Sequence, residues 1–480
     1  MASTHHPHFV LFPFMAKGHT IPLLHLAQLL LRRGVTLTLF TTKSNRPFVS
    51  QFLHRHANSI SVIDLPFPTN VEGIPQGTES TDKLPSMSLF WEFVSATKLM
   101  QSHFEQALNN LSDVTCIVSD GFLSWTLESA NKLGIPRVSF FGMTGYSTAV
   151  ALEVGVNRLL SGPESDSDDG LITVTNFPWI KVTRNDFDQP FNQPDPTGRE
   201  VDCLMEIVVA IANSHGLIMN SFYELEPLFI DYLNREYSTF KAWCVGPLCL
   251  AEWSTIGVSI PDADDRKPKW VGWLDQKLSQ GRSVLYVAFG SQVEISTPQL
   301  KAIAKGLEDS QVSFLWVVRK SEMTISHIID DLQKKVGERG IIVGEWVDQR
   351  EILKHESVKG FVSHCGLNSV MESICSEVPI LAWPMMADQH LNARMVVEEI
   401  KIGLRVETCD GSVRGFVKSE GLKKMVKELM EGERGKEVRK KVMEVGKAAK
   451  AAMAEDGSSW RTLDELIDDV KSVGNDGRLV

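Results

Sequence analysis

The chain has 480 residues, too long for one ordinary domain, and 43% of them are hydrophobic, which is enough for sizeable cores. Acidic residues number 60 against 49 basic ones, and no basic stripe is present, so nucleic acid is not an expected partner. The seven cysteines are scattered, which favours a reducing compartment over a disulfide framework.

The N-terminal part predicts a strand, a helix and a second strand. Residues 8–14 form an apolar run, and an apolar-faced helix over His19–Arg33 ends at Gly34, before a strand over Val35–Thr42. This βαβ unit implies a parallel sheet with a right-handed crossover. The first apolar run contains a proline and does not resemble a signal peptide. No run reaches membrane-spanning length, so we expect a cytoplasmic protein without integral membrane association.

Two more buried strands are predicted at Cys116–Ser119 and Arg137–Phe141. Residues 161–170 form an acidic loop, and residues 187–200 form a second irregular stretch. Residues 252–269 contain two prolines and many charges, which is typical of an interdomain linker.

Strand–helix alternation resumes at Ser283 and continues to about Val406. A basic amphipathic helix, whose charges indicate a solvated face, is predicted over Lys436–Ala454, and a terminal helix over Ser458–Val470. The similar order of elements in the two halves favours two Rossmann-like domains. The glycine fingerprint of dinucleotide-binding folds and the Walker A pattern are both missing, which argues against a nucleotide-cofactor oxidoreductase.

The block from Trp346 to Gln389 is the most informative part of the chain. Within it, a strand over Lys359–Ser363 is broken by Gly366, and a helical pattern follows until Pro379. Such a turn directs backbone N–H groups and the positive end of a helix dipole at one point, where a diphosphate fits. Additional side-chain donors would come from His364, Asn368 and Ser369.

These residues also have ordinary structural explanations. Ser369 and Glu372 have the spacing of a capping box, and Asn368 is a common N-cap. Taken singly, His364 is more typical of a packed histidine and Trp346 of a core residue. We interpret Cys365 as a small packing residue and not as a nucleophile. A zinc-protease helix is excluded, because Lys359 stands where its second histidine is required.

The spacing of the whole block resembles the signature box of plant UDP-dependent small-molecule glycosyltransferases, which begins with Trp and ends with Asp-Gln. Similar segments elsewhere are residues 8–30, 118–122, 273–275 and 283–291, so the resemblance covers nearly the whole chain. It implies an α/β protein of the GT-B type, in which two Rossmann-like, doubly wound parallel-sheet domains face each other across a cleft. We expect an N-terminal acceptor domain over 1–250, a linker over 251–269, a donor domain over 270–455, and a C-terminal helix over 456–480 that returns to the first domain.

The resemblance implies a role for each matched position. Uracil would stack on Trp346 and contact the backbone of Val347, and the ribose would be bound by Gln349 and Glu372. The phosphates would be bound by Ser291, His364, Gly366, Asn368 and Ser369, and the sugar hydroxyls by Asp388 and Gln389.

One sugar-site position departs from the family pattern, since Leu367 replaces the usual Trp. The effect of this change on donor choice is open. The closing Gln389 favours glucose over galactose by family analogy. UDP-sugar would be a co-substrate; neither a cofactor nor a metal is expected.

The catalytic pair is expected in the first half. His19 lies at the start of a helix, whose dipole keeps the imidazole neutral and basic, and Asp120 ends a buried strand where it could orient the ring. Without the resemblance, a helix-capping histidine and a strand-end aspartate would be the simpler interpretation. The expected reaction is a single displacement with inversion, in which UDP leaves without help from a metal.

The acceptor pocket is also expected in the first half. Apolar side chains near strand ends or loops could line this pocket or belong to the core: Phe14, Phe90, Trp91, Phe122 and Met143. A flavonoid or another phenol is the first choice; triterpenoids, steroids, plant hormones and transfer to carbon are alternatives. A catalytically weak UDP-sugar-binding protein is the alternative of a different class. We expect a monomer.

Overall fold

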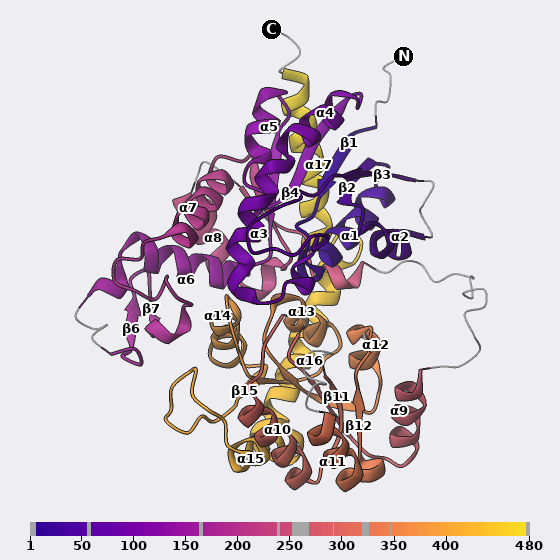
Figure 1. Cartoon of the computed structure of the whole chain (residues 1–480), viewed down its shortest axis with the longest axis vertical. Helices are drawn as coiled ribbons and strands as arrows, with labels where there is room; N and C mark the ends of the chain where they lie inside the picture. The colour runs from indigo at the N-terminus through magenta and orange to yellow at the C-terminus, as the bar shows by residue number, and fades with distance from the viewer. Residues whose placement is uncertain are drawn as a thin grey trace. The chain divides into compact units, whose positions relative to one another are not determined.

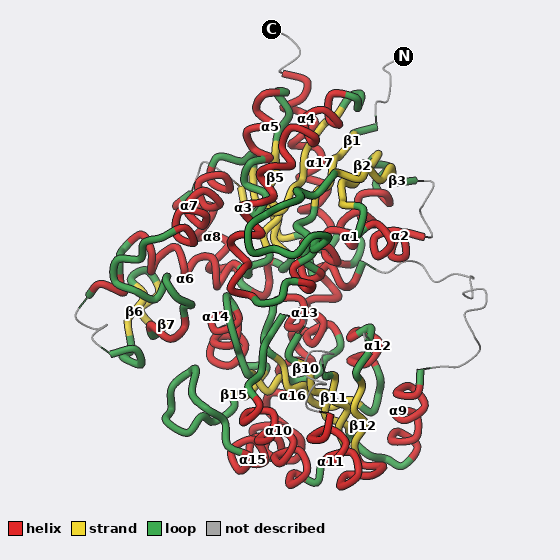
Figure 2. The backbone as a smooth tube through the Cα atoms, viewed as in Figure 1, coloured by secondary structure: helices red, strands yellow, loops and turns green. Residues whose placement is uncertain are grey.

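The computed structural model describes residues 6–54, 59–162, 167–237, 241–251, 268–290, 292–318, 326–345 and 347–476. The chain forms two compact units. Unit 1 consists of Met1–Gly145, Asp195–Trp253 and Ala451–Val480, and unit 2 of Tyr146–Pro194 and Ser254–Lys450. Helices flank the strands in each unit (Figures 1 and 2). None of the helices in these ranges is both long and apolar enough to cross a bilayer.

Unit 1 contains a seven-stranded parallel sheet. Its strands are, in spatial order, β3 (Ile60–Leu65), β2 (Thr36–Thr42), β1 (His8–Phe12), β4 (Val114–Asp120), β5 (Arg137–Phe141), β8 (Gly216–Met219) and β9 (Lys241–Cys244). The order reverses between β1 and β4, which makes this the point where ligands bind in doubly wound sheets. The β1 residues Phe9–Phe12 are fully buried, as expected for a strand covered on both faces.

The helices of unit 1 follow the strands of the sheet and cover it. They are α1 (Lys17–Arg32), α2 (Arg46–Leu53), α3 (Phe90–Thr97), α4 (Gln101–Asn109), α5 (Thr126–Lys132), α7 (Arg199–Ala212), α8 (Pro227–Glu236) and α17 (Ser458–Asp476). The predicted strands and the first helix are confirmed within two residues. The second irregular stretch is shorter than predicted, because α7 already begins at Arg199.

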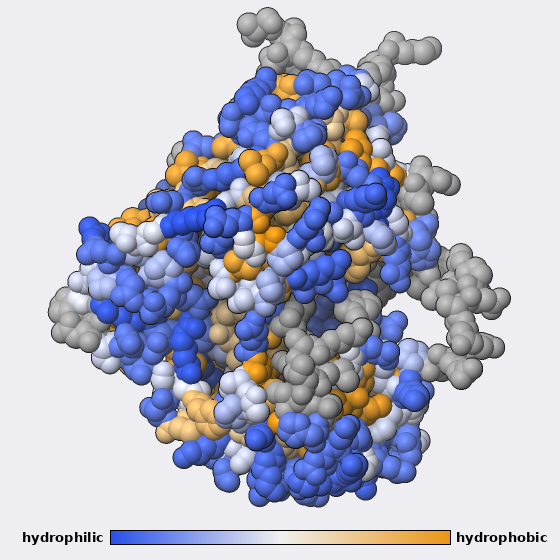
Figure 3. Space-filling view, in the orientation of Figure 1, coloured by the Kyte–Doolittle hydropathy of each residue, from blue (hydrophilic) through white to orange (hydrophobic). Residues whose placement is uncertain are grey.

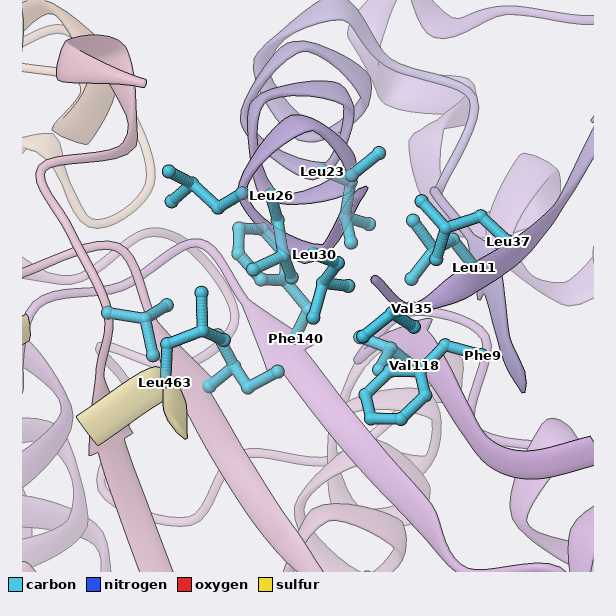
Figure 4. Packing of buried hydrophobic residues seen from close by; sticks show 14 of the residues in the cluster. Phe9, Leu11, Leu23, Leu26, Leu30, Val35, Leu37, Val118, Phe140 and Leu463 are labelled. Atoms are coloured by element: carbon cyan, nitrogen blue, oxygen red, sulfur yellow. The ribbon is translucent and has the colours of Figure 1, made fainter. Parts of the chain in front are cut away.

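The last helix, α17, is part of the core of unit 1. Its Leu463, Leu466, Ile467 and Val470 are buried in one cluster with side chains of β1, α1 and β4. Figure 4 shows Leu463 close to Leu26 and Leu30 of α1, and Figure 1 shows α17 in yellow beside β4. The C-terminal end of the chain therefore closes the first hydrophobic core.

Unit 2 contains a six-stranded parallel sheet in the order β12 (Gly340–Val343), β11 (Ser313–Val317), β10 (Val284–Ala288), β13 (Val358–Ser363), β14 (Ile380–Ala382) and β15 (Gly403–Arg405). Its order reverses between β10 and β13. An antiparallel pair, β6 (Ile172–Val174) and β7 (Phe177–Val182), belongs to the same unit. A second buried cluster fills the space between this sheet and its helices. The side of the molecule seen in Figure 3 is mostly hydrophilic, in agreement with this burial.

The helices of the second half are α9 (Lys269–Ser279), α10 (Thr297–Ser310), α11 (Ser326–Val336), α12 (Gln349–Lys354), α13 (Leu367–Cys375), α14 (Gln389–Arg394), α15 (Ser419–Glu431) and α16 (Glu433–Met453). Helix α6 (Gly145–Val156) precedes the β6–β7 pair. Most of the predicted linker lies outside the described residues, and the predicted domain boundaries stay a prediction. Residues 146–194, which we assigned to the first domain, belong to unit 2 in the structure.

Candidate active site

His19 and Asp120 meet where the strand order of the first sheet reverses, between β1 and β4, which is called the switch point of the sheet. His19 lies in the first turn of α1, and Asp120 is the last residue of β4. Nδ1 of His19 lies 2.8 Å from Oδ2 of Asp120, and the other carboxylate oxygen accepts the backbone N–H of Phe122 at 3.0 Å. Asp120 is fully buried, whereas 22% of the His19 side chain is exposed. A carboxylate next to Nδ1 favours the tautomer with its hydrogen on Nδ1, which leaves the lone pair on Nε2.

A buried arginine lies behind this pair. Arg137 donates from Nη2 to the backbone oxygen of Asp120 at 3.2 Å and from Nε to the Ser119 hydroxyl at 2.9 Å. Burial lowers the pKa of Arg137 to about 10, and the charge of Asp120 opposes that shift. The sequence analysis missed Arg137; the only signal was a charged residue at the start of an apolar strand.

Aromatic side chains surround His19. Its ring centroid lies 5.6 Å from that of Phe14 and 5.3 Å from that of Phe122. Phe122 also contacts Phe90 at 5.2 Å and Trp91 at 6.2 Å. Phe14 is fully buried, so it supports the cluster from within, whereas the other three are partly exposed. The His19 surroundings are therefore apolar and aromatic.

Met143 is the remaining candidate for the acceptor pocket, and it is also partly exposed. It follows Gly142, at which an added Cβ would lie 3.6 Å from Cε1 of His19. The structure therefore places Met143 in the chain next to a residue that borders the catalytic pair.

The switch point of the second sheet carries the predicted strand–turn–helix. Strand β13 ends at Ser363, Cys365 is left-handed with φ 65°, and Gly366 is the N-cap of α13. The capping interpretation of Asn368 and Ser369 is wrong, since both residues lie inside the first turn of the helix. Ser369 is buried and Asn368 partly exposed.

The His364 ring fits this turn only because two glycines, Gly290 and Gly366, lie against it in space. A Cβ at Gly290 or Gly366 would lie 2.7 Å or 2.6 Å from Nε2 of His364. Burial lowers the pKa of His364 to about 4, so the ring is neutral at pH 7. Its Nδ1 is buried and has no hydrogen-bond partner within the described ranges. Ser291, the next predicted phosphate ligand, lies outside the described residues.

A polar network links α12 to α13. Nε2 of Gln349 donates to Glu372 Oε2 at 2.6 Å and to the Ser369 hydroxyl at 2.9 Å. The buried Tyr286 of β10 donates to Oε1 of Gln349 at 3.2 Å. Burial raises the pKa of Glu372 to about 7. The structure thus unites the two residues predicted to bind ribose and adds Tyr286, which the sequence analysis missed.

The other half of the predicted uridine site is only partly described. Trp346 lies outside the described residues. Val347 is partly exposed, two residues before α12.

The predicted sugar-binding pair begins α14. Asp388 is its N-cap, and Oε1 of Gln389 accepts the backbone N–H groups of Met385 and Met386, each at 3.1 Å. Asn392, another residue missed in the sequence, donates to Asp388 Oδ2 at 2.8 Å and to the Cys365 oxygen at 3.0 Å. Asn392 therefore ties the start of α14 to the turn before α13.

Two further side chains near the turn are buried. Leu367 begins α13 and is 6% exposed. Burial raises the pKa of the Cys365 thiol to about 12, which disfavours a thiolate. Across the described part of the chain, no group of three or more His, Cys, Asp or Glu residues could hold a metal ion.

The chain matches known proteins over nearly its whole length. The family model described as UDP-glucoronosyl and UDP-glucosyl transferase matches residues 264–450. UDP-glycosyltransferase 90A1 of Arabidopsis thaliana is 55% identical over 97% of this chain and 96% of its own length. UDP-glucose flavonoid 3-O-glucosyltransferase 7 of Fragaria ananassa is 33% identical over 98% of this chain and 97% of its own length.

A solved structure gives the same result for the fold. The crystal structure of Glycyrrhiza uralensis UGT73P12 complexed with glycyrrhetinic acid 3-O-monoglucuronide covers 98% of this chain and 97% of its own, with a TM-score of 0.85 and 29% identity. Together with the two parallel sheets, this match defines a GT-B protein. The chain belongs to the plant UDP-glycosyltransferase family, and it is a UDP-sugar glycosyltransferase of plant small molecules. The resemblance found in the sequence is confirmed.

Proposed function

We propose that this enzyme transfers glucose from UDP-glucose to a hydroxyl group of a flavonoid or another phenol, with inversion at the anomeric carbon. The contact between His19 and Asp120 is the observation that carries this proposal. A buried carboxylate 2.8 Å from Nδ1 orients the ring and stabilises its protonated form. His19 can then act as the general base at Nε2.

The reaction is one displacement. Nε2 of His19 takes the proton of the acceptor hydroxyl, the oxygen attacks the anomeric carbon, and the bond from that carbon to the diphosphate breaks. UDP leaves with the electron pair, so an α-linked donor gives a β-glycoside. The Asp120 carboxylate compensates the positive charge that forms on the imidazole.

The second sheet supplies the groups for the donor. We assign the ribose hydroxyls to the Gln349–Glu372 pair, since a carboxylate and an amide can hold a diol. The phosphates are assigned to the turn before α13, with Ser369 and the neutral His364 as side-chain donors. The buried Nδ1 of His364 has no hydrogen-bond partner among the described residues, which supports a ligand role for this side chain. Trp346, Ser291 and Val347 retain the roles implied by the family box.

Glucose and a phenolic acceptor are supported by the family box, by one relative and by the aromatic surroundings of His19. Gln389 closes the box as in glucose-using relatives, and the Fragaria ananassa relative is named for UDP-glucose and a flavonoid. The aromatic side chains around His19 suit a flat aromatic acceptor. The ligand of the Glycyrrhiza uralensis structure supports a triterpenoid or steroid acceptor as the second candidate.

The test is a mass-spectrometric assay of the purified protein. UDP-glucose, UDP-galactose, UDP-xylose and UDP-glucuronate are each combined with flavonoids, simple phenols, hormones, steroids and triterpenoids. We expect a product heavier by one hexose with UDP-glucose and a phenol. A product with triterpenoids alone would contradict the phenolic assignment. Tight UDP binding without any product would favour a sugar-binding protein that does not catalyse.

A further inference from the structure

Helix α14, at whose start the predicted sugar-binding pair lies, is fastened by a segment far away in the sequence. That segment, residues 183–188, contains one 3-10 turn, Arg184–Asp186, and belongs to unit 2 like α14 itself. The Asp186 carboxylate accepts the backbone N–H of Thr183 at 2.6 Å, and the Thr183 side chain accepts the backbone N–H of Asp186, which together form a capping box. The segment thus has a defined conformation of its own.

Asp186 fastens the end of α14. Oδ2 of Asp186 lies 2.9 Å from Nε and 2.8 Å from Nη2 of Arg394, the last residue of the helix. The side chains are 0% and 7% exposed, so this is a buried ion pair. Breaking such a pair leaves an uncompensated buried charge, which is strongly destabilising. Asp186 is therefore a structural anchor and a poor choice for testing function.

Asp188 fastens the turn before α14. Its Oδ2 accepts the backbone N–H of Ala387 at 2.6 Å. Ala387 has φ 53°, a left-handed conformation that is unfavourable for a residue with a Cβ and has to be held by its surroundings. Asp388 and Gln389 follow directly, so the conformation of Ala387 sets where their side chains point.

The second oxygen of Asp188 is held as well. Oδ1 of Asp188 lies 2.6 Å from Nη2 of Arg414, and Nε of Arg414 donates to the Asn185 oxygen at 2.7 Å. Arg414 thus binds the segment at two points and fixes the rotation of the carboxylate. This leaves Oδ2 directed at the Ala387 N–H group.

We propose that Asp188 is a positioning residue for sugar recognition, acting through the left-handed turn at Ala387 on Asp388 and Gln389. The proposal rests on the proposed function, which assigns the donor sugar to that pair. Gln349, Glu372 and His364, to which we assign the nucleotide, lie on other elements. Losing Asp188 should therefore weaken the binding of the sugar part of the donor and leave the nucleotide part unaffected.

The experiment measures Kd by calorimetry for UDP and for UDP-glucose with the full-length protein. For Asp188→Ala we expect about tenfold weaker binding of UDP-glucose, as for a lost charge-assisted hydrogen bond, and less than a twofold change for UDP. Asp188→Asn retains an oxygen that can accept the Ala387 N–H. Its Kd values for UDP and UDP-glucose should therefore stay within about threefold of those of the parent.

Two further variants separate positioning from general damage. Arg414→Met removes the ion pair and the hydrogen bond to the Asn185 oxygen but keeps the Asp188 contact with Ala387, so it should have a smaller effect than Asp188→Ala. Ala387→Gly keeps Asp188 but makes the turn more flexible, so it should weaken the binding of UDP-glucose and not that of UDP. This variant provides the test if Asp188→Ala does not fold. Equal weakening of UDP and UDP-glucose, or unchanged Kd values, would overturn the proposal. A parent protein that binds both ligands but makes no product would contradict the proposed function alone.

Discussion

The two ring nitrogens of His19 differ because of one buried carboxylate. Asp120 binds Nδ1, and Asp120 is itself fixed by the Phe122 N–H group and lies beside the buried Arg137. The sequence allowed His19 and Asp120 to be predicted, because both stand at strand–helix junctions of a recognisable family pattern. Arg137 and Tyr286 could not be predicted, since a polar residue in an apolar strand gains its meaning only from partners that the fold brings to it.

Replacing His19 by Ala should separate catalysis from binding. General base catalysis contributes roughly 10²–10⁴-fold, so we expect turnover to fall by that factor, while the Kd of UDP changes less than twofold. Product formation followed by mass spectrometry and UDP calorimetry measure the two effects. The matched control is His103→Ala, an exposed histidine of α4 in the same unit, which should behave like the parent. Parallel loss of turnover and UDP binding would indicate a structural role for His19.

Glu372 should make donor binding dependent on pH. Its pKa is raised to about 7, and ribose hydroxyls donate best to an ionised carboxylate, so affinity should fall as the pH falls through 7. Between pH 8 and pH 6 we expect up to about tenfold weaker binding of UDP-glucose, measured by calorimetry. Glu372→Gln should bind more weakly at pH 8 and lose the pH dependence. A pH-independent Kd in the parent would contradict the ribose assignment.

The same shift has the opposite effect on stability. Because the folded pKa of about 7 exceeds the ordinary value of 4.5, the folded protein binds this proton more tightly than the unfolded chain. Glu372 therefore lowers the free energy of unfolding as the pH rises from 4.5 to 7. Glu372→Gln should bind UDP-glucose less tightly and yet be more stable at pH 8.

At the scale of the element, the turn between β13 and α13 combines a left-handed Cys365, the N-cap Gly366 and a tightly packed His364. Strand, turn and helix were all predictable from the apolar run, Gly366 and Pro379. The position of the N-cap was not, because Asn368 and Ser369 are better capping residues than Gly366 by their chemistry alone. The close approach of the His364 ring, which leaves no room for a Cβ at position 366, is a tertiary contact that the local sequence does not show.

Gly366→Ala tests this crowding. The added Cβ would lie 2.6 Å from Nε2 of His364, so the ring or the turn must move. The affinity of the turn for phosphate should therefore fall. We expect at least tenfold weaker UDP binding by calorimetry. Gly272→Ala in α9 is the control: its Cβ meets nothing within 4 Å, and Ala favours the helix, so UDP binding should be unchanged and stability equal or slightly higher. Normal UDP binding in Gly366→Ala would contradict our placement of the phosphates.

At the scale of the whole molecule, the two parallel, doubly wound sheets followed from strand–helix alternation and the family pattern. The assignment of residues 146–194 to unit 2 could not be predicted, because nothing in their sequence indicates against which of the two sheets their helices and strands pack. The core role of α17 is a further long-range feature, in which Leu463, Leu466, Ile467 and Val470 share one buried cluster with leucines of α1.

Leu466→Ala measures how strongly the end of the chain stabilises the first core. Leu466 is fully buried, and a Leu-to-Ala change in such a site typically reduces the free energy of unfolding by about 2–5 kcal/mol. Urea denaturation followed by tryptophan fluorescence should show this loss. Val473→Ala on the same helix is the control, because Val473 is 41% exposed and should change stability by less than about 0.5 kcal/mol. Equal effects of the two changes would mean that α17 is not part of the stable core.

Because residues 146–194 belong to unit 2, chimeras built from two related enzymes depend on where the two sequences are joined. A chimera joined within residues 251–269 would take Asp186 and Asp188 from one parent, and Arg394 and Ala387 from the other. Such a hybrid could change its preference among sugar donors although the whole box from Trp346 to Gln389 is inherited intact. Exchanging unit 1 as a whole, with α17, would require four crossovers, one at each boundary between the two units, and would leave residues 146–194 with the recipient.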